Sequence, residues 1–439
     1  MTWVSLLLGL ALPAHAGAFP YPVDQRALDN GLTVYVVPMP SPGAASFVTW
    51  MQVGSRDEVD EGRTGFAHFF EHLMFFGTET LGGREREREV LRLGIGENAW
   101  TLIDDTVYHG LVSTENLPRY VEIEADRFQS LTLTPDDVQK ESGAVYGEFR
   151  KSQASPDNAL SVAMWAAAFE QHTYGHDTIG YEADIAAMPN AHAYAMAFFD
   201  RFYRPENAHV LVVGDVEPDA AHALVASHFG SWAAGAVPRP EVPEEPEQTQ
   251  LRRVELSWPS DTAPRLQMAW KVPAHDPTRP EIAHLALVDD LLLSSIAPLR
   301  QRLIREEGLA YDLSGGGMDS VDPGLFGIDV TAKEGADLAH IEAVIREELA
   351  ALADGVSADL LQRTADQARY RFMTSLDNPD DVAQSLGWHL RRHPDPASLD
   401  TFFEHYASAT AEDVATLVRN TFVDERLTIG TLVATEAGE

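Results

Sequence analysis

Cysteine is absent from this chain of 439 residues. Its absence excludes disulfide bonds, thiolate metal sites, a cysteine nucleophile and a lipid-modified N-terminal cysteine. The redox compartment stays open, because a chain without thiols can fold in an oxidising or a reducing environment.

Basic residues are scarce as well. The chain holds 32 Lys and Arg against 68 Asp and Glu, which gives a formal net charge of −36 at pH 7. A field of this sign repels nucleic acid and anionic membrane surfaces, and it favours cations and basic peptides. We therefore expect no nucleic-acid partner, although solubility or adaptation to salt accounts for such a charge equally well.

Long apolar runs are missing beyond the N-terminus, so we expect no membrane span in the mature chain. Trp3–Leu12 is apolar but too short to cross a bilayer, and residues 14–16 read Ala-His-Ala, a small-x-small cleavage pattern. No Lys or Arg precedes the apolar run. The pattern predicts a signal peptide over residues 1–16, cleavage near Ala16, and a periplasmic or secreted protein that starts near Gly17.

The chain as a whole has the composition of a globular protein with sizeable cores, at 45% hydrophobic residues. Apolar periodicity and capping residues predict its elements. The expected strands cover 32–37, 45–50, 98–113 and 208–213, and the expected helices cover about 65–77, 116–129, 134–151 and 218–229. Because strands and helices follow no strict strand–helix–strand order, the chain predicts an α+β fold with a largely antiparallel sheet.

Residues 234–250, AGAVPRPEVPEEPEQTQ, have four prolines and four glutamates without apolar periodicity, which indicates an extended linker. It divides the mature chain into an N-terminal domain (17–233) and a C-terminal domain (251–439). The two halves show a weak internal repeat. Trp50 with its following loop and helix resembles Trp270 followed by residues 281–291.

This repeat bears on a candidate metal site. It aligns Glu71-His72-Leu73 with Asp289-Asp290-Leu291 and places Ala286 where the first half has His68. We therefore expect two homologous domains, of which the second lacks metal ligands.

The candidate site begins with the run His-Phe-Phe-Glu-His at residues 68–72. On a helix, His68 and His72 lie on one face, one turn apart, and Glu71 projects beside them. The run is an inverted form of the His-Glu-x-x-His zinc signature. A catalytic zinc usually has three protein ligands and one open position, so one ligand is missing from this run. The alternative reading makes both histidines part of a packed core.

Glu148 is the natural third ligand. Thr134 predicts a helix cap, Pro135 suits the first helical position, and acids at the start and bases at the end complete the helix signal. Glu141 and Glu148 are two turns apart on this helix and share a face. One carboxylate can bind metal while the other steadies the site. In the alternative reading, the two glutamates are only part of a solvent-exposed helix face.

With these residues the chain resembles the pitrilysin-like or insulinase-type metallopeptidases, the family that includes the mitochondrial processing peptidase. The resemblance spans nearly the whole mature chain and depends chiefly on residues 65–78 together with Glu141 and Glu148. Weaker matching blocks are residues 98–101, 174–180, 202–207 and 307–311. The resemblance implies two homologous domains, each a largely antiparallel sheet packed with helices.

The resemblance also implies roles for the candidate residues. His68, His72 and Glu148 would hold one Zn²⁺ per chain, and Glu71 would act as the general base that activates water. Glu141 matches the family's supporting carboxylate.

Three further residues take roles from the resemblance. Asn98 and Ala99 match a strand beside which these enzymes bind the substrate backbone, although Asn98 alone suggests a turn. Tyr311 matches a catalytic tyrosine of the second domain that pairs with an arginine seven residues earlier. Here that position is isoleucine, and the nearest arginines are Arg302 and Arg305. One residue turns an α-helix by about 100°, so Arg305 would not point where the pattern requires, and which of the two arginines takes that place stays open.

The leading hypothesis is a zinc-dependent endopeptidase that acts on peptides or unfolded proteins. Two alternatives stay open: a structural or binding subunit whose partner performs the chemistry, and a zinc hydrolase with another substrate. We expect a homodimer or a heterodimer with a related chain, because two such domains make half of the family's closed chamber.

Overall fold

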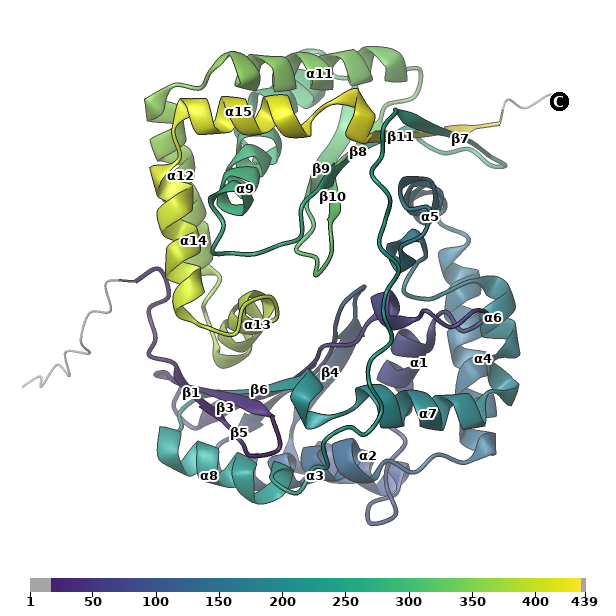
Figure 1. The fold of residues 1–439 in the computed structure, drawn as a ribbon, viewed down its shortest axis with the longest axis vertical. Coiled ribbons are helices and arrows are strands. Elements are labelled where there is room, and N and C mark those ends of the chain that lie inside the picture. Colours follow the sequence, from purple (N-terminus) through teal and green to yellow (C-terminus); the bar gives the residue numbers. More distant parts are fainter. Residues whose placement is uncertain (1–16, 436–439) are drawn as a thin grey trace, which may run out of the picture.

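The computed structural model describes residues 17–435, so the predicted signal peptide lies outside the described residues. Within this range the chain forms two halves, each with one sheet and a set of helices, placed one above the other (Figure 1). The predicted α+β class with two homologous domains is confirmed.

The first half contains a six-stranded sheet in the order β1-β2-β6-β3-β5-β4. Its strands are β1 (Asp24–Ala27), β2 (Thr33–Pro38), β3 (Ala44–Met51), β4 (Gly96–Thr101), β5 (Thr106–Ser113) and β6 (Ala208–Gly214). β2 and β6 are parallel, and all other neighbours are antiparallel. Alternate residues of β2 enter different cores: Val34 and Val36 face one, and Tyr35 and Val37 face the other. Both faces of this sheet are therefore covered.

The helices of the first half are α1 (Phe66–Leu73), α2 (Gly83–Leu93), α3 (Leu117–Ser130), α4 (Pro135–Ser152), α5 (Pro156–Ala168), α6 (Glu182–Ala187), α7 (His192–Phe202) and α8 (Pro218–Phe229). Short 3₁₀ turns lie at Ser55–Asp57, Thr173–Gly175, Met188–Asn190 and Pro205–Asn207. The start of α4 follows the sequence prediction closely. Thr134 and Asp137 form a capping box, and Pro135 occupies the first turn.

The second half contains a five-stranded sheet in the order β7-β11-β8-β10-β9. Its strands are β7 (Arg252–Trp258), β8 (Arg265–Val272), β9 (Ala310–Gly317), β10 (Gly324–Ala332) and β11 (Leu427–Ala434). β7 and β11 are parallel, and the other neighbours are antiparallel. This is the order and direction of β2-β6-β3-β5-β4 in the first half. The topology thus supports the internal repeat.

The residue register proposed for that repeat is wrong by one position. Met51 pairs with the first residue of β6, and Trp270 pairs with the first residue of β11, so these two are equivalent. Both lie in the core beneath the helices of their own half, whereas Trp50 points to the opposite face. A shift of one residue along a strand moves each side chain to the opposite face of the sheet. Aligning the two tryptophans was therefore misleading.

The helices of the second half are α9 (Pro280–Leu293), α10 (Pro298–Arg300), α11 (Leu338–Asp354), α12 (Ala358–Thr374), α13 (Pro379–Leu390), α14 (Ala397–Ser408) and α15 (Ala411–Thr421). A π-helical turn follows at Gln301–Glu306, and a 3₁₀ turn lies at Asp424–Arg426. The stretch Pro280–Glu306 is long and apolar enough by composition to cross a membrane, contrary to our reading of the apolar runs. In this fold 56% of its apolar window is buried, as is common for a core helix.

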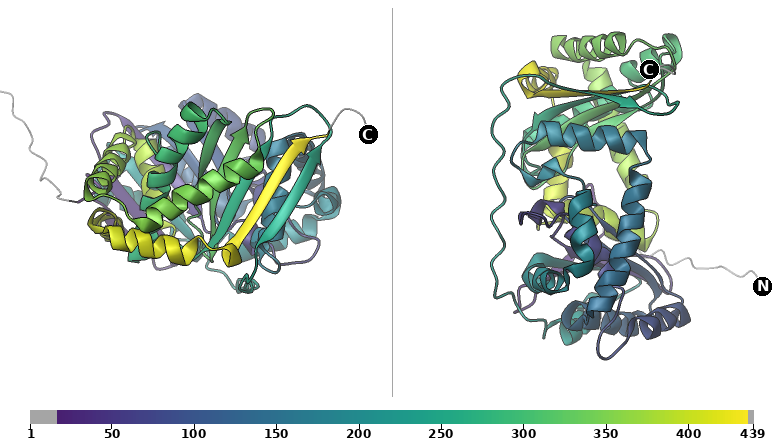
Figure 2. Two further views of the ribbon diagram at one scale, coloured as in Figure 1. Left: turned by 90° about the horizontal axis from the view of Figure 1, so that it is seen from above. Right: turned by 90° about the vertical axis from the view of Figure 1, so that its right-hand side faces the viewer.

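Each half covers part of the other half's sheet. Val382 and Leu386 of α13 pack with Trp50 on the first sheet. Conversely, Leu160 and Met164 of α5 join the core on the second sheet. Residues 234–250 form neither helix nor strand and run along one side of both halves (Figure 2).

Buried ion pairs add to this contact between the halves. The Arg392 guanidinium lies 2.8 Å from Asp104 and 2.9 Å from Asp105. Arg56 of the first half forms a further, partly buried pair with Asp322 of the β9–β10 hairpin at 2.5 Å. Charges buried in this way are costly to separate, so the two halves are expected to hold a fixed relative position.

Candidate metal centre

Helix α1 carries three of the candidate residues, and its first turn is held by a buried carboxylate. Glu58 accepts hydrogen bonds of 2.7 Å from the backbone N–H groups of Gly65 and Ala67. Gly65 has a φ of 86°, and a side chain there would meet the carbonyl oxygen of Ile179 at 2.4 Å. Gly180 approaches the same turn from residues 174–180. Close backbone contact therefore fixes where α1 begins.

Three potential ligand atoms converge beside α1. The Glu148 carboxylate oxygen Oε2 lies 3.4 Å from His68 Nε2 and 3.6 Å from His72 Nε2. Within residues 17–435 this is the one group of three His, Asp or Glu side chains whose ligand atoms lie within 4.8 Å of one another. α1 supplies both imidazoles, and α4, packed against it, supplies the carboxylate.

This geometry fits a tetrahedral zinc ion. Ligand atoms placed about 2.0–2.1 Å from a tetrahedral zinc lie about 3.3 Å from one another, close to the separations observed here. Two imidazoles and one carboxylate are also a common donor set for catalytic zinc. Glu148 is half exposed, at 49% of its side chain, so the group faces solvent on one side. Water and substrate can therefore reach it.

Glu141 lies behind His72 on α4. Its Oε1 is 2.8 Å from His72 Nδ1. This hydrogen bond is the main reason why the pKa of His72 lies above its usual value. When Nδ1 keeps its proton and donates it to Glu141, the lone pair of Nε2 points toward Glu148. The two turns between Glu141 and Glu148 place them as the spacing predicts.

His68 lacks a comparable support. Its Nδ1 is buried and has no hydrogen-bond partner among the described residues. Burial, and then the proximity of His72, lower the pKa of His68. A neutral imidazole, the form that binds metal, is thereby favoured at this position.

His68, His72 and Glu148 are called the candidate triad below. Glu71 lies beside this triad and faces β4. Its Oε2 accepts a hydrogen bond of 2.6 Å from the Thr101 hydroxyl. Burial raises the pKa of Glu71, and the bond to Thr101 partly offsets this effect. A carboxylate with a raised pKa is better suited to accept and return a proton near neutral pH.

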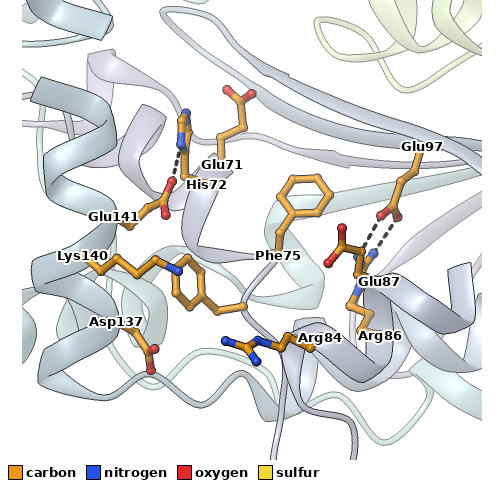
Figure 3. Close-up of a pocket in the computed structure, with 12 residues that line it drawn as sticks. Glu71, His72, Phe75, Arg84, Arg86, Glu87, Glu97, Asp137, Lys140 and Glu141 are labelled. Carbon is orange, nitrogen blue, oxygen red and sulfur yellow. Dashed lines mark hydrogen bonds and ion pairs between the residues drawn. The ribbon is translucent and has the colours of Figure 1, made fainter. Parts of the chain in front are cut away.

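A cleft of about 790 Å³ opens next to Glu71 and His72 (Figure 3). Phe75 and Phe76 contribute aromatic rings to its lining, and Arg84 and Lys140 contribute charged groups. Lys140 Nζ lies 5.9 Å from the centre of the Phe76 ring. The remaining lining residues are Gly83, Arg86, Glu87, Glu97, Asp137 and Glu141. The candidate centre thus lies at the edge of a space that can hold a substrate side chain.

Asn98 and Ala99 lie on β4, so Asn98 is a strand residue and not a turn residue. β4 is the last strand of its sheet and pairs only with β5 among the described strands. Its position is held by Glu97, which forms two hydrogen bonds of 2.8 and 2.6 Å with Arg86 of α2. Through Thr101 and Glu71, the open edge of β4 lies next to the triad.

The structure does not bring Tyr311 to the metal centre of its own chain. Tyr311 is 54% exposed, and its hydroxyl donates to Glu334 at 2.6 Å. It lies near the start of β9, whereas the end of β9 and the hairpin at 318–323 face the first half.

The arginines before Tyr311 are not at the centre either. Arg302 pairs with Glu307 and Glu347, at 2.6 and 2.8 Å, and Arg305 is exposed without an ion pair among the described residues. The segment is a π-turn, with a hydrogen bond from Glu307 N–H to Arg302 O. The rotation of 100° per residue that we assumed for an α-helix therefore does not apply.

Two residues that position the site had no assigned role in the sequence reading. Glu58 anchors the start of α1, and Thr101 binds Glu71. Neither has a spacing signal, because each reaches α1 only through tertiary packing. Thr101 does fall within the block 98–101 that carries the family resemblance.

Comparison with known proteins now identifies the relatives. The family described as "Insulinase (Peptidase family M16)" matches residues 36–182, and that described as "Peptidase M16 inactive domain" matches residues 194–368. The chain belongs to peptidase family M16. The expected resemblance is confirmed, and the candidate triad lies within the first of the two matches.

Individual relatives agree with this assignment. The zinc protease PqqE of Helicobacter pylori is 28% identical, with 96% of this chain and 95% of that protein covered. A crystal structure of a protease from Helicobacter pylori has a TM-score of 0.88 at 26% identity and covers 94% of this chain and 99% of the other. The periplasmic protease PqqL of Escherichia coli has a TM-score of 0.77 at 20% identity, and the match covers 95% of this chain but 48% of PqqL. At that identity PqqL shows the fold alone.

Proposed function

We propose that this family M16 chain is a zinc-dependent endopeptidase that hydrolyses peptides or unfolded proteins. The observation that carries the proposal is the convergence of His68, His72 and Glu148, with Glu71 beside them at the edge of a cleft. These three residues would hold one Zn²⁺ per chain. The ion would supply Lewis-acid chemistry, which acidifies water and polarises a peptide carbonyl.

Glu71 is the proposed general base. It lies one residue before His72 on α1 and lines the cleft, where a water molecule would meet the proposed ligands. Its raised pKa favours accepting a proton from that water and passing it to the leaving amine. Thr101 orients the carboxylate through the hydrogen bond to Oε2.

β4 is the proposed binding strand for the substrate backbone. An extended peptide that pairs with Asn98 and Ala99 along the open edge of β4 would pass the triad, and main-chain hydrogen bonds would hold it whatever its side chains. Such binding suits unfolded chains. The net charge of −36 further favours basic peptides.

The alternative, a structural subunit whose partner performs the chemistry, has less support. A subunit without chemistry has no use for three converging ligands, a supported His72 and a cleft-lining Glu71. The experiment that separates the two is hydrolysis of a denatured basic protein by the purified chain, with and without a chelator and after zinc is restored. Absence of any chelator-sensitive hydrolysis by the chain, alone or at high concentration, would favour the subunit.

Glu141→Gln is expected to weaken the site without destroying it. The amide keeps the size of the side chain but weakens the hydrogen bond to His72 Nδ1. Losses of this kind typically cost about 10- to 100-fold in metal affinity or activity. Zinc affinity by competition with a coloured chelator and turnover on a peptide would both be measured, with Glu85→Gln on α2 as the matched control. Wild-type values in both measurements would show that Glu141 does not support the metal site.

We also propose that the active species is a dimer, with itself or with a related chain. One copy leaves the cleft open to solvent and does not bring Tyr311 to its own centre, and PqqL is about twice as long as the part that matches this chain. Specific activity is therefore expected to fall as the enzyme is diluted through the dissociation constant of the dimer. Light scattering at the same concentrations would check the mass. A monomer with full activity at nanomolar concentration would be incompatible with this proposal.

For location we propose the periplasm or the exterior of the cell. The apolar run at residues 3–12 and the Ala-His-Ala pattern support this.

A further inference from the structure

The first described residues of the chain lie against the second half. Ala18 and Phe19 are buried, and Phe19 packs in the core that joins Trp50 of β3 to Leu399 of α14. The purple start of the chain lies beside α14 in Figure 1. The N-terminal segment thus connects the first half to a helix of the second.

Asp400 of α14 receives this segment. Its Oδ1 accepts a hydrogen bond of 2.5 Å from the Ala18 N–H. A Cβ added to Gly17 would lie 2.6 Å from both carboxylate oxygens of Asp400, so this carboxylate lies directly across residue 17. Glycine is the residue that leaves room for it. Asp400 forms no ion pair among the described residues.

The surroundings of Asp400 favour an additional cation. A cavity of about 480 Å³ between α12 and α14 is bounded by Gly17 and Ala18 and contains the acids Asp366, Asp400 and Glu404. Arg369 is the cation among its lining residues, and Tyr406 uses its hydroxyl to bind Asp290. Three carboxylates therefore face one guanidinium.

Gly17 is also the residue that follows the predicted cleavage site. Hydrolysis of the Ala16–Gly17 amide by a signal peptidase consumes one water and leaves a carboxylate on Ala16 and an α-amine on Gly17. Near neutral pH that amine is protonated, because its usual pKa is about 8. Cleavage thus creates a new ammonium group at the residue across from Asp400.

We propose that the α-ammonium group released on Gly17 pairs with the Asp400 carboxylate, and that this additional pair strengthens the contact of the N-terminal segment with α14 once the leader has been removed. Processing then does more than release the protein. It completes a contact between the two halves. The pair is charge-assisted and partly shielded, which makes it stronger than an exposed surface pair.

The test compares two starting points of the purified chain in a double-mutant cycle. One form begins at Gly17 with a free amine, and the other retains His15 and Ala16; each is made with Asp400 and with Asp400→Asn. The free-amine form is expected to melt about 2–4 °C higher than the extended form, as a contribution near 1 kcal/mol would give in a chain built of domains of this size. Asp400→Asn should abolish that difference.

Glu404→Gln and Asp366→Asn are the matched controls, because they remove a nearby charge but leave Asp400 in place. Both should preserve most of the difference. The difference should also shrink above about pH 8, since pairing raises the pKa of the amine and its stabilisation is lost as pH rises through that value. Equal melting temperatures at pH 6.5, or a difference that persists in Asp400→Asn, would overturn the proposal.

A second readout does not depend on the stability of the variant. The rate at which an amine-specific reagent labels Gly17 should be several-fold lower with Asp400 than with asparagine, because pairing shields the amine. N-terminal sequencing of protein exported from cells must also return Gly17. A start at any other residue would refute the proposal and leave the peptidase assignment untouched.

Discussion

Glu71→Gln is expected to reduce peptide hydrolysis by about 10²- to 10⁴-fold, the range that general acid–base catalysis contributes. Glutamine has nearly the same shape and can still bind the Thr101 hydroxyl, so the fold around β4 should remain. It cannot accept the proton of an attacking water. Turnover by this variant would be measured on an unstructured basic peptide under single-turnover conditions.

The value of this variant is that it separates chemistry from metal binding. Glu71 is not among the three proposed ligands, so the Glu71→Gln protein should still contain about one zinc per chain. Its zinc content by mass spectrometry is the internal control, and Glu85→Gln on α2 controls for the loss of one negative charge. Substantial chelator-sensitive activity in Glu71→Gln would show that another group is the base.

The sequence predicts those parts of this centre whose residues are close together in the chain or lie on one helix. His68 and His72 are one turn apart, so helix geometry alone places them together. Glu148 comes from another helix, yet the expected cap at Thr134, the proline after it and the spacing from Glu141 indicate where that helix begins and which face both carboxylates share. These signals are local, and the structure brings the residues together as they predict.

Contacts made by tertiary packing could not be predicted in this way. Glu58 reaches the start of α1 from a loop, and Thr101 reaches Glu71 from a strand; neither residue has a periodicity that reports its partner. The packing of α5 on the second sheet and of α13 on the first sheet could not be predicted either. Apolar patterning shows that a helix is covered on one face, but it does not show which sheet covers it.

The errors of the sequence reading have the same origin. A tryptophan in each half suggested a register for the repeat, but strand pairing shows that Met51 and Trp270 are equivalent. The arginine expected before Tyr311 was judged by α-helical geometry, whereas the segment is a π-turn. Both errors came from assuming a register or a helix type for one segment alone. In the folded chain, the neighbouring segments determine both.

Glu148→Gln is expected to remove most of the bound zinc together with the activity. Glu148 is the one proposed ligand that α4 supplies, and an uncharged amide is a poor replacement for a carboxylate that would neutralise the ion. The loss of zinc affinity should exceed the roughly 100-fold that is the upper range for groups one step further from a metal, such as Glu141. The order of effects, Glu148 above Glu141, is itself part of the prediction.

Thermal unfolding provides a measurement of this loss that does not depend on catalysis. Zinc at 100 times its dissociation constant stabilises the folded protein by about 2.7 kcal/mol, so the melting temperature of wild type should rise when zinc is added. Glu148→Gln should show little rise at the same concentration. Its melting temperature without metal should stay near that of wild type, because the side chain is 49% exposed and glutamine keeps its size and a carbonyl oxygen next to His68 and His72. A zinc-induced rise equal to that of wild type would mean that Glu148 is not a ligand, and the proposed centre would need another third group.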